Sequence, residues 1–144
     1  MPRLGPMPRQ ARTRSVGTAR TLGYAAKAEE YVAAAATELK AGRTIAATSL
    51  AIHAAINAAD AVCGIRLGKR AAGVAHEQVL ALLREAGKDG TDLERHLRRL
   101  LPMKATTEYE PDDISASTAA GAVERAQKCV SIARRLAAAA PQHR

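Results

Sequence analysis

Residues 44–64 read TIAATSLAIHAAINAADAVCG, and this stretch decides which kind of fold the chain can form. Ala is the strongest helix former and loses no side-chain entropy on burial, and it recurs throughout the stretch. Ile45, Ile52, Ile56 and Val62 add larger apolar groups at helical spacing. We therefore predict a helix over residues 44–64 that lies at the centre of the fold and is its most buried element.

Helical periodicity continues on both sides of this stretch. Tyr24, Tyr31 and Leu39 recur on one stripe of a helix predicted over residues 20–41. The connection to the central helix is so short that these two helices must form an antiparallel hairpin. Three further helices are predicted over residues 74–86, 91–101 and 115–140.

The boundaries of these helices rest on capping residues and breakers. Thr91 with Glu94 three residues later matches a capping box, and Ser115 is the predicted N-cap of the last helix. Loops are then predicted at residues 65–73, 87–90 and 103–114. We predict an all-α fold, an up-and-down antiparallel bundle of about five helices over residues 21–140.

Positive charge is concentrated at the start of the chain. The sequence has 22 Lys and Arg against 14 Asp and Glu, a net charge of +8. Six of the basic residues precede Glu29, the first acid, so the remainder is close to balance. Residues 1–20 hold three Pro, two Gly and five Arg with no apolar periodicity, and this predicts a disordered basic tail. Clustered Arg of this kind can contact phosphates without sequence preference.

Cys63 and Cys129 are the only cysteines, and both fall on apolar faces of predicted helices. We expect buried, reduced thiols, because nothing in the sequence is typical of secretion. Two cysteines without CxxC spacing do not predict a zinc site, and no metal or cofactor is expected. No apolar run reaches the length of a signal peptide or a membrane span, so we predict a cytoplasmic protein with no membrane contact.

Four segments, taken in order, resemble the HEPN family of small helical-bundle domains. The first is SLAIHAAINAADA at residues 49–61, and the second is RAAGVAHEQVLALL at residues 70–83. The third is LRRLLPMKATTEY at residues 97–109, and the fourth is Ser115 with the small residues of the closing helix. The resemblance implies a helical bundle that commonly dimerises. It also implies either a metal-independent ribonuclease of toxin–antitoxin and defence systems or a non-catalytic partner within them.

The chain departs from the family at the residues that cleave RNA. Ribonuclease members carry Arg-x(4–6)-His in the third segment, where this chain has Lys104 and Tyr109. His titrates near neutral pH and can take the proton of a 2′-hydroxyl, whereas an unperturbed Tyr has a pKa near 10. Lys lacks the bidentate fork with which Arg holds phosphate. These replacements favour a binding module over an enzyme.

Polar residues on the central helix form the main candidate site. His53, Asn57 and Asp60 share one side of an otherwise apolar helix, where polar groups must be hydrogen-bonded or solvated. With Lys104 and Tyr109 from the opposite segment they would line a cleft. Asp60 would orient His53 there, and Lys104 would hold an anionic group. The alternative is structural, either a network tying this helix to residues 103–110 or a polar seam in a dimer interface.

Two basic groupings are weaker candidates. Arg70 and His76 have the family's Arg-to-His spacing but lie at the start of a different helix, where a solvated Arg and a helix-start His explain them. His96 lies beside Arg95, Arg98 and Arg99, and such a cluster is more often a solvated face than an RNA-binding ridge, since no aromatic residues interleave with it.

These features lead to one main functional prediction and two alternatives. The main one is a HEPN-like homodimeric binding module, with a partner protein from the same operon and with RNA or a nucleotide as a further ligand. The first alternative is a ribonuclease with His53 or His76 as base and Lys104 or Arg70 as phosphate clamp. The second is a nucleic-acid-binding protein driven by residues 1–20.

Overall fold

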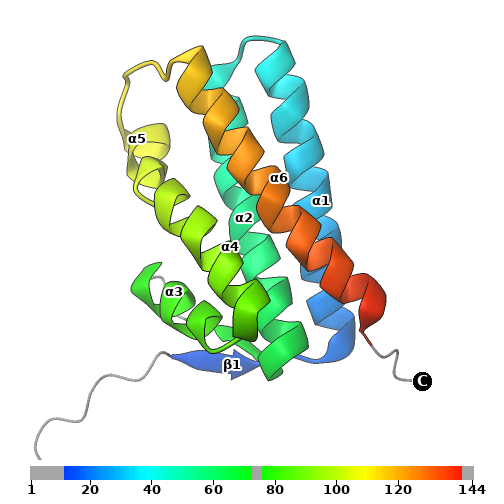
Figure 1. The fold of residues 1–144 in the computed structure, drawn as a ribbon. Helices are drawn as coiled ribbons and strands as arrows, with labels where there is room; N and C mark the ends of the chain where they lie inside the picture. Colours follow the sequence, from blue (N-terminus) through cyan, green and yellow to red (C-terminus); the bar gives the residue numbers. More distant parts are fainter. Residues whose placement is uncertain (1–11, 73–75, 141–144) are drawn as a thin grey trace, which may run out of the picture.

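The computed structural model describes residues 12–72 and 76–140, and these form the predicted all-α bundle (Figure 1). The part of the chain that the structure describes contains six helices and a small two-stranded sheet. The helices are α1 (Thr18–Lys40), α2 (Thr44–Leu67), α3 (His76–Arg84), α4 (Gly87–Leu100), α5 (Met103–Tyr109) and α6 (Ala116–Ala139). The strands are β1 (Thr13–Ser15) and β2 (Lys69–Ala71).

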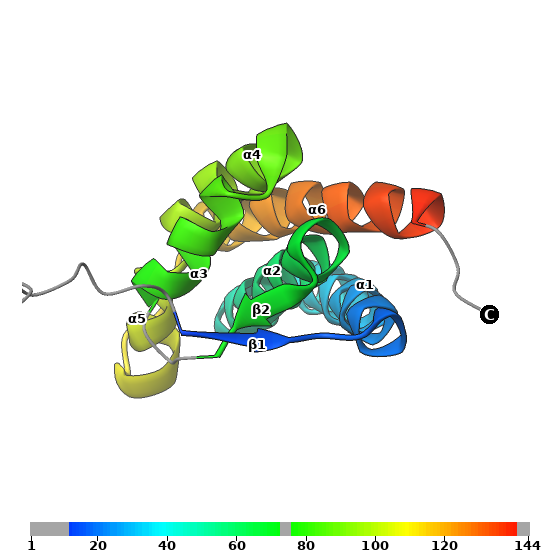
Figure 2. The same ribbon diagram turned by 90° about the horizontal axis from the view of Figure 1, so that it is seen from below.

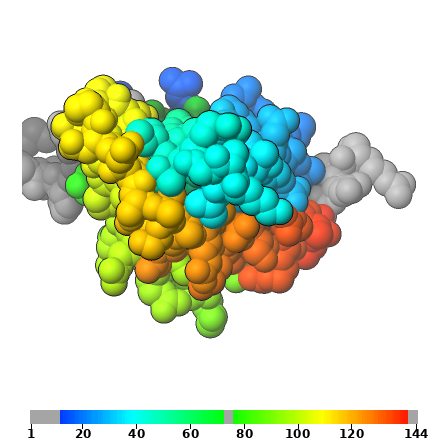
Figure 3. Space-filling model, turned by 90° about the horizontal axis from the view of Figure 1, so that it is seen from above, coloured from blue at the N-terminus to red at the C-terminus, as the bar shows by residue number. Residues whose placement is uncertain are grey.

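The four longest helices alternate in direction along the bundle. Figure 1 shows α1 and α4 running towards one end, and α2 and α6 running back. The short helix α3 lies near the start of α4, and α5 lies at the other end of α4, where it contacts α2. Figure 3 shows that end from above, with α5 (yellow) beside the residues around the turn between α1 and α2 (cyan). Figure 2 shows β1 and β2 on the side of α1 and α2 that is remote from α4 and α6. The bundle therefore has two distinct outer faces, one formed by α4 with α6 and the other by α1, α2 and the strands.

Helix α2 is the central element, as its sequence predicts. It packs against α1, α6 and α4, and it also contacts α3, α5 and β2. Seven of its alanines are fully buried, and Ile52 and Val62 are also inaccessible to solvent. Burying a side chain of that size contributes about 1.5–3 kcal/mol. The small side chains of its buried alanines let several neighbours approach α2 at once.

The end of α2 lies three residues beyond the prediction. The helix stops at Gly68, which has φ +68° and donates its backbone N–H to the carbonyl of Gly64 at 3.0 Å. Gly64 serves a different purpose, because a Cβ added there would lie 2.5 Å from the hydroxyl oxygen of Thr21. The glycine at 64 therefore marks the close approach of α1, and the left-handed glycine at 68 marks the helix end.

The strands correct two predictions about irregular segments. β1 and β2 pair antiparallel, with Thr13 opposite Ala71. Residues 13–15 of the predicted disordered tail and residues 69–71 of the predicted loop therefore form strands. Residues 18–20 of that tail belong to α1, and residues 65–67 of that loop belong to α2. Backbone bonds from Ala72 to Arg12 and from Val16 to Gly68 extend the ladder. Three-residue strands bury too little to leave an alternating pattern in the sequence. Residues 1–11 of the predicted tail lie outside the described residues.

Helix α4 starts four residues earlier than predicted, and its predicted cap is wrong. Gly87 has φ +77°, which reverses the chain so sharply after α3 that the residues predicted as a turn are already helical. Thr91 accordingly lies inside the helix and donates its hydroxyl to the carbonyl of Gly87 at 3.1 Å. Glu94 is buried and pairs with Arg84 and Arg98, so it ties α3 to α4 and caps nothing.

Other expectations near the chain's second half are confirmed or refined. Ser115 caps α6 by accepting the backbone N–H of Thr118 at 3.1 Å. The segment 103–114 is irregular only after Tyr109, because α5 occupies its first part. Cys63 and Cys129 are both buried and free, and burial raises the pKa of each thiol to about 12. Thiols in this state are unreactive at neutral pH.

Only α2, among the described residues, is long and apolar enough to cross a membrane. In the most apolar 18-residue stretch of this helix, 61% is buried inside the bundle. Core helices of soluble proteins have the same length and composition, so this helix is explained by its central position.

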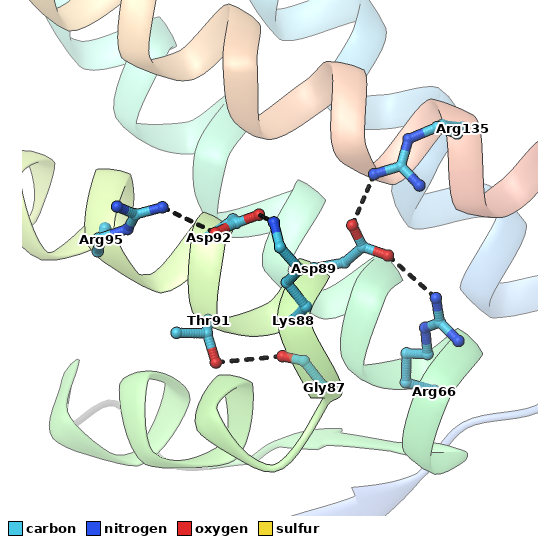
Figure 4. Close-up of polar contacts among 8 residues, drawn as sticks. All are labelled: Arg66, Gly87, Lys88, Asp89, Thr91, Asp92, Arg95 and Arg135. Atoms are coloured by element: carbon cyan, nitrogen blue, oxygen red, sulfur yellow. Dashed lines mark hydrogen bonds and ion pairs between the residues drawn. The ribbon is translucent and has the colours of Figure 1, made fainter.

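One carboxylate joins three helices at the end of the bundle where the strands lie (Figure 4). Asp89 at the start of α4 accepts hydrogen bonds from Arg66 of α2 at 3.0 Å and from Arg135 of α6 at 2.6 Å. The bond from Arg135 is the main reason that the pKa of Asp89 is lowered. The contribution of this three-way ion pair to stability is therefore present at neutral pH and is lost as pH falls through the lowered pKa.

The glycines give a matched test of the packing. We expect Gly90→Ala to destabilise the bundle by about 1–3 kcal/mol, because its Cβ would lie 2.2 Å from the backbone oxygen of Leu83. Gly121→Ala on α6 meets nothing within 4 Å and should stabilise by up to about 1 kcal/mol through helix propensity. Urea unfolding of both variants measures this difference. Equal effects at the two sites would contradict the close approach of α3 and α4.

Candidate functional site

Three of the seven sequence-predicted site residues, His53, Asp60 and Arg70, fall on the outer face formed by α1, α2 and β2. We call this the α1–α2 face and define it by Tyr24, Lys27, Tyr31, His53, Asp60 and Arg70. Tyr24, Tyr31, His53, Asp60 and Arg70 are half-buried, and Lys27 is exposed. Helix α1 supplies the aromatic rings, α2 supplies the titratable groups, and β2 supplies the arginine.

An aromatic stack forms the middle of this face. The rings of Tyr31 and His53 lie 5.7 Å apart between centroids, with 29° between their planes. The Lys27 ammonium lies 5.7 Å from the centroid of the Tyr31 ring, within range of a cation–π contact. His53 is therefore positioned by packing against α1 across the hairpin, a contact that spacing along α2 alone does not indicate.

Asn57 plays a local role. Its side-chain Nδ2 donates to the backbone carbonyl of His53 at 2.8 Å, one turn earlier in the same helix. The residue is buried, and this bond satisfies its amide donor within α2. Asn57 thus shares a side of the helix with His53 and Asp60, while its observed bond stays inside α2.

Asp60 lies near Arg70, close enough for the charge of Arg70 to act on its carboxylate. Burial raises the pKa of Asp60 to about 6, and the positive charge of Arg70 opposes that rise. Arg70 itself donates to the backbone oxygen of Ala71 at 3.0 Å, and its guanidinium carbon lies 5.8 Å from the Tyr24 ring centroid. Within residues 12–72 and 76–140 the Asp60 carboxylate has no hydrogen-bond or ion-pair partner. Its acceptor capacity is unused by those residues.

The expected pairing of His53 with Asp60 does not form. Seven residues of α-helix separate them, which places their backbones about 10 Å apart along the axis. Both side chains lie on the same side of α2, but no hydrogen bond joins them. Asp60 therefore does not orient the imidazole, and the two groups act on different parts of the face.

The remaining predicted residues lie elsewhere. Lys104 and Tyr109 belong to α5, and Tyr109 is 79% exposed. His76 begins α3. In the described part of the chain, no hydrogen bond or ion pair links these three side chains to His53, Asp60 or Arg70. The structure therefore brings together His53, Asp60 and Arg70 with two tyrosines, while α5 and the start of α3 contribute no polar contact to them.

The α1–α2 face offers one carboxylate with a pKa of about 6, two cations, an imidazole and two aromatic rings. No group of three His, Cys, Asp or Glu side chains within the described ranges is placed to hold a metal ion. Both thiols are buried in the core. Such a face suits a partner that presents hydrogen-bond donors and apolar surface.

Sequence reasoning missed the partners that come from other elements. Tyr24 and Tyr31 follow the apolar stripe of α1, so the sequence predicts core residues, yet both remain half-exposed on the α1–α2 face. Their seven-residue spacing, which matches that of His53 and Asp60, was an available signal. Arg70 joins the face only because β2 pairs with β1, and no sequence pattern indicated that pairing.

Known proteins provide no further guidance to the site. No family model matches this chain, and no curated protein has a matching sequence.

The titration of Asp60 gives a test of this geometry. A folded-state pKa of about 6 lies above the ordinary Asp pKa of 3.8, so the native state binds the extra proton and stability falls as pH rises between those values. Asp60→Asn should therefore stabilise the protein by about 1–3 kcal/mol at pH 8 and have little effect at pH 4. Thermal unfolding at both pH values measures this.

Asp92→Asn is the matched control for that experiment. The hydrogen bond from Lys88 lowers the pKa of Asp92, and Arg95 lowers it further. Replacing this carboxylate should give no gain at pH 8. A loss of stability in the Asp60 variant at pH 8 would show that the Asp60 carboxylate is fully paired in the fold.

Proposed function

We propose that this chain is a non-catalytic, HEPN-like binding module that works as a homodimer in a toxin–antitoxin or defence-type system. The observation that carries the proposal is the α1–α2 face, on which two aromatic rings and a carboxylate that no described residue pairs lie half-buried at the surface. Aromatic rings that carry a polar group are enriched at protein interfaces, where one end is apolar and the other is hydrogen-bonded. A partner protein seated on this face would bury the rings and donate hydrogen bonds to the carboxylate.

The charges on the face support a second copy of the chain as that partner. A twofold interface brings the same patch from both subunits together, so the patch must complement itself. This face carries a carboxylate at Asp60 and cations at Lys27 and Arg70, which allows opposite charges to meet across such an axis. Ile56 lies between His53 and Asp60 on α2 and supplies half-buried apolar surface near the centre.

The arrangement of the remaining groups supports binding over RNA cleavage. A metal-free ribonuclease needs a base and a phosphate clamp that converge on one reacting group. Lys104 and Tyr109 belong to a separate short helix, and His53 is packed against Tyr31 with no carboxylate beside it. The buried thiols at Cys63 and Cys129 suit a reducing compartment, and we accordingly propose a cytoplasmic location.

One observation favours the ribonuclease as a second candidate. Asp60 has a pKa of about 6 and lies beside Arg70, which is the pairing that a general base and a phosphate clamp would need. Incubation of the purified protein with labelled RNA and a chelator separates the two candidates. We expect intact RNA. Metal-independent cleavage that is lost in both Asp60→Asn and Arg70→Gln would replace the binding module by the enzyme.

The dimer is tested by mass in solution. We expect the wild-type chain to sediment at about twice 15.1 kDa at micromolar concentration. Lys27→Glu changes an exposed side chain and should weaken the dimer at least about tenfold by introducing a like-charge contact with Asp60 across the axis. Ile56→Arg should abolish it. Ser131→Arg, on the exposed side of α6, is the control and should leave the dimer intact.

Circular dichroism of each variant shows whether the bundle has folded. A wild-type chain that stays monomeric up to about 100 μM, or a dimer that Ser131→Arg breaks as readily as Lys27→Glu, would contradict the proposed interface.

A further inference from the structure

A basic groove is lined by residues of α4 and α6, two helices that pack against each other. Figure 2 shows these helices on the side of the bundle away from the strands. The volume of the groove is about 400 Å³. The lining residues are Arg95, His96, Arg98, Arg99 and Arg125. Four of these residues, those of α4, form the cluster around His96 that the sequence predicts to be a solvated face. Arg125 joins them from α6, because antiparallel packing brings the first half of α6 beside the second half of α4.

A hydrogen bond between the two helices organises the groove. The Arg125 guanidinium and the His96 Nδ1 lie 3.2 Å apart. Since a guanidinium can only donate, Nδ1 accepts and the imidazole carries its proton on Nε2. Burial is the main reason that the pKa of His96 is lowered, and Arg125, Lys128 and Arg95 lower it further against Asp92. His96 therefore holds Arg125 in place while it stays neutral itself.

The groove carries more positive charge than its own acids offset. Arg95 pairs with Asp92 at 2.7 Å, and Arg98 pairs with the buried Glu94. Arg99 and Arg125 have no acidic partner within the described ranges. Two guanidinium groups with unused donors thus face one groove, next to a neutral imidazole with an Nε2–H donor. Every one of these groups donates hydrogen bonds, so the complementary ligand is an anion with several acceptor oxygens.

The layout of the cations favours a row of phosphates. Arg95 and Arg99 are one turn apart on α4, about 6 Å along the helix axis, and Arg125 lines the same groove from α6. Cations spread along one helix, with a further cation on the opposite wall, fit a linear polyanion better than one compact anion. Guanidinium groups match phosphate oxygens in pairs. No Tyr side chain lines the groove, and the one ring there, His96, is hydrogen-bonded to Arg125, so the groove is suited to the backbone of a nucleic acid more than to its bases.

We propose that the groove between α4 and α6 binds the phosphodiester backbone of a nucleic acid without sequence preference, with Arg99 and Arg125 as its principal phosphate contacts. This binding does not depend on the dimer, because the groove and the α1–α2 face share no residue. It also does not depend on residues 1–20, although their arginines can add affinity of their own.

Fluorescence anisotropy of the full chain with a labelled 20-base-pair RNA duplex tests the proposal. We expect affinity to fall linearly with salt on logarithmic axes. The double change Arg99→Glu and Arg125→Glu should weaken binding at least about tenfold and flatten the salt slope by about two. Lys40→Glu with Arg43→Glu makes the same change in net charge at the α1–α2 turn, and it should alter affinity by less than about threefold.

Three further arms identify the ligand and the site. A DNA duplex should bind in the same groove, while inorganic phosphate or polyglutamate should compete only weakly. Arg3→Gln with Arg9→Gln in the full chain should leave the effect of the Arg99 and Arg125 changes intact. His96 ring resonances in NMR should shift when duplex is added to the wild type and stay unchanged in the Arg99 and Arg125 variant.

Several results would overturn the proposal. If the Arg99 and Arg125 variant and the Lys40 and Arg43 variant lost RNA affinity equally, net charge and not the groove would account for the binding. Loss of all binding in the Arg3 and Arg9 variant would assign it to residues 1–20. Polyglutamate binding as tight as the RNA duplex would identify an acidic protein as the ligand. Absence of RNA binding would overturn the groove proposal and leave the dimer proposal standing, because sedimentation tests the dimer independently.

Discussion

Close packing around α2 is the constraint on which the rest of the structure depends. Its buried surface is made largely of Ala, and a helix of small side chains lets neighbouring helices approach nearer than Leu or Phe would allow. Three long helices and the strand pair can therefore surround one element. The same constraint decides where polar chemistry can occur. His53 and Asp60 lie half-buried on the side of α2 that its helical neighbours leave partly open, and this gives the α1–α2 face.

The fold was largely predictable because its information is local. Helical periodicity placed all the long helices, and the short connection after α1 set the antiparallel hairpin. Ser115 was recognisable as a cap because its bond to Thr118 lies within one turn of α6. The errors arose where a neighbour in space overrode a local signal. Thr91 resembles a cap in sequence, but the reversal at Gly87 extends α4 past it. β1 exists only because β2, more than fifty residues away, offers a partner.

Only the part of the α1–α2 face that depends on spacing along a single helix could be predicted from the sequence. Spacing along α2 correctly put His53, Asn57 and Asp60 on one side. It could not show that Asn57 would bond to its own helix, or that His53 would stack on Tyr31. The contacts with Tyr24 and Arg70 depend on the α1–α2 hairpin and on the strand pairing. In the groove between α4 and α6, likewise, the arginines of α4 were visible in the sequence, but the contribution of Arg125 required the tertiary structure.

The three-way ion pair at Asp89 has a consequence for how the chain becomes a bundle during synthesis. Arg66 leaves the ribosome first and Asp89 soon after, but Arg135 emerges only near the end of α6. Until then the alanine-rich side of α2 that α6 covers stays exposed to water and to other chains. The nascent α1–α2 hairpin therefore passes through a period of vulnerability to aggregation or to capture by a chaperone. That period closes when the last long helix docks and its arginine reaches the carboxylate.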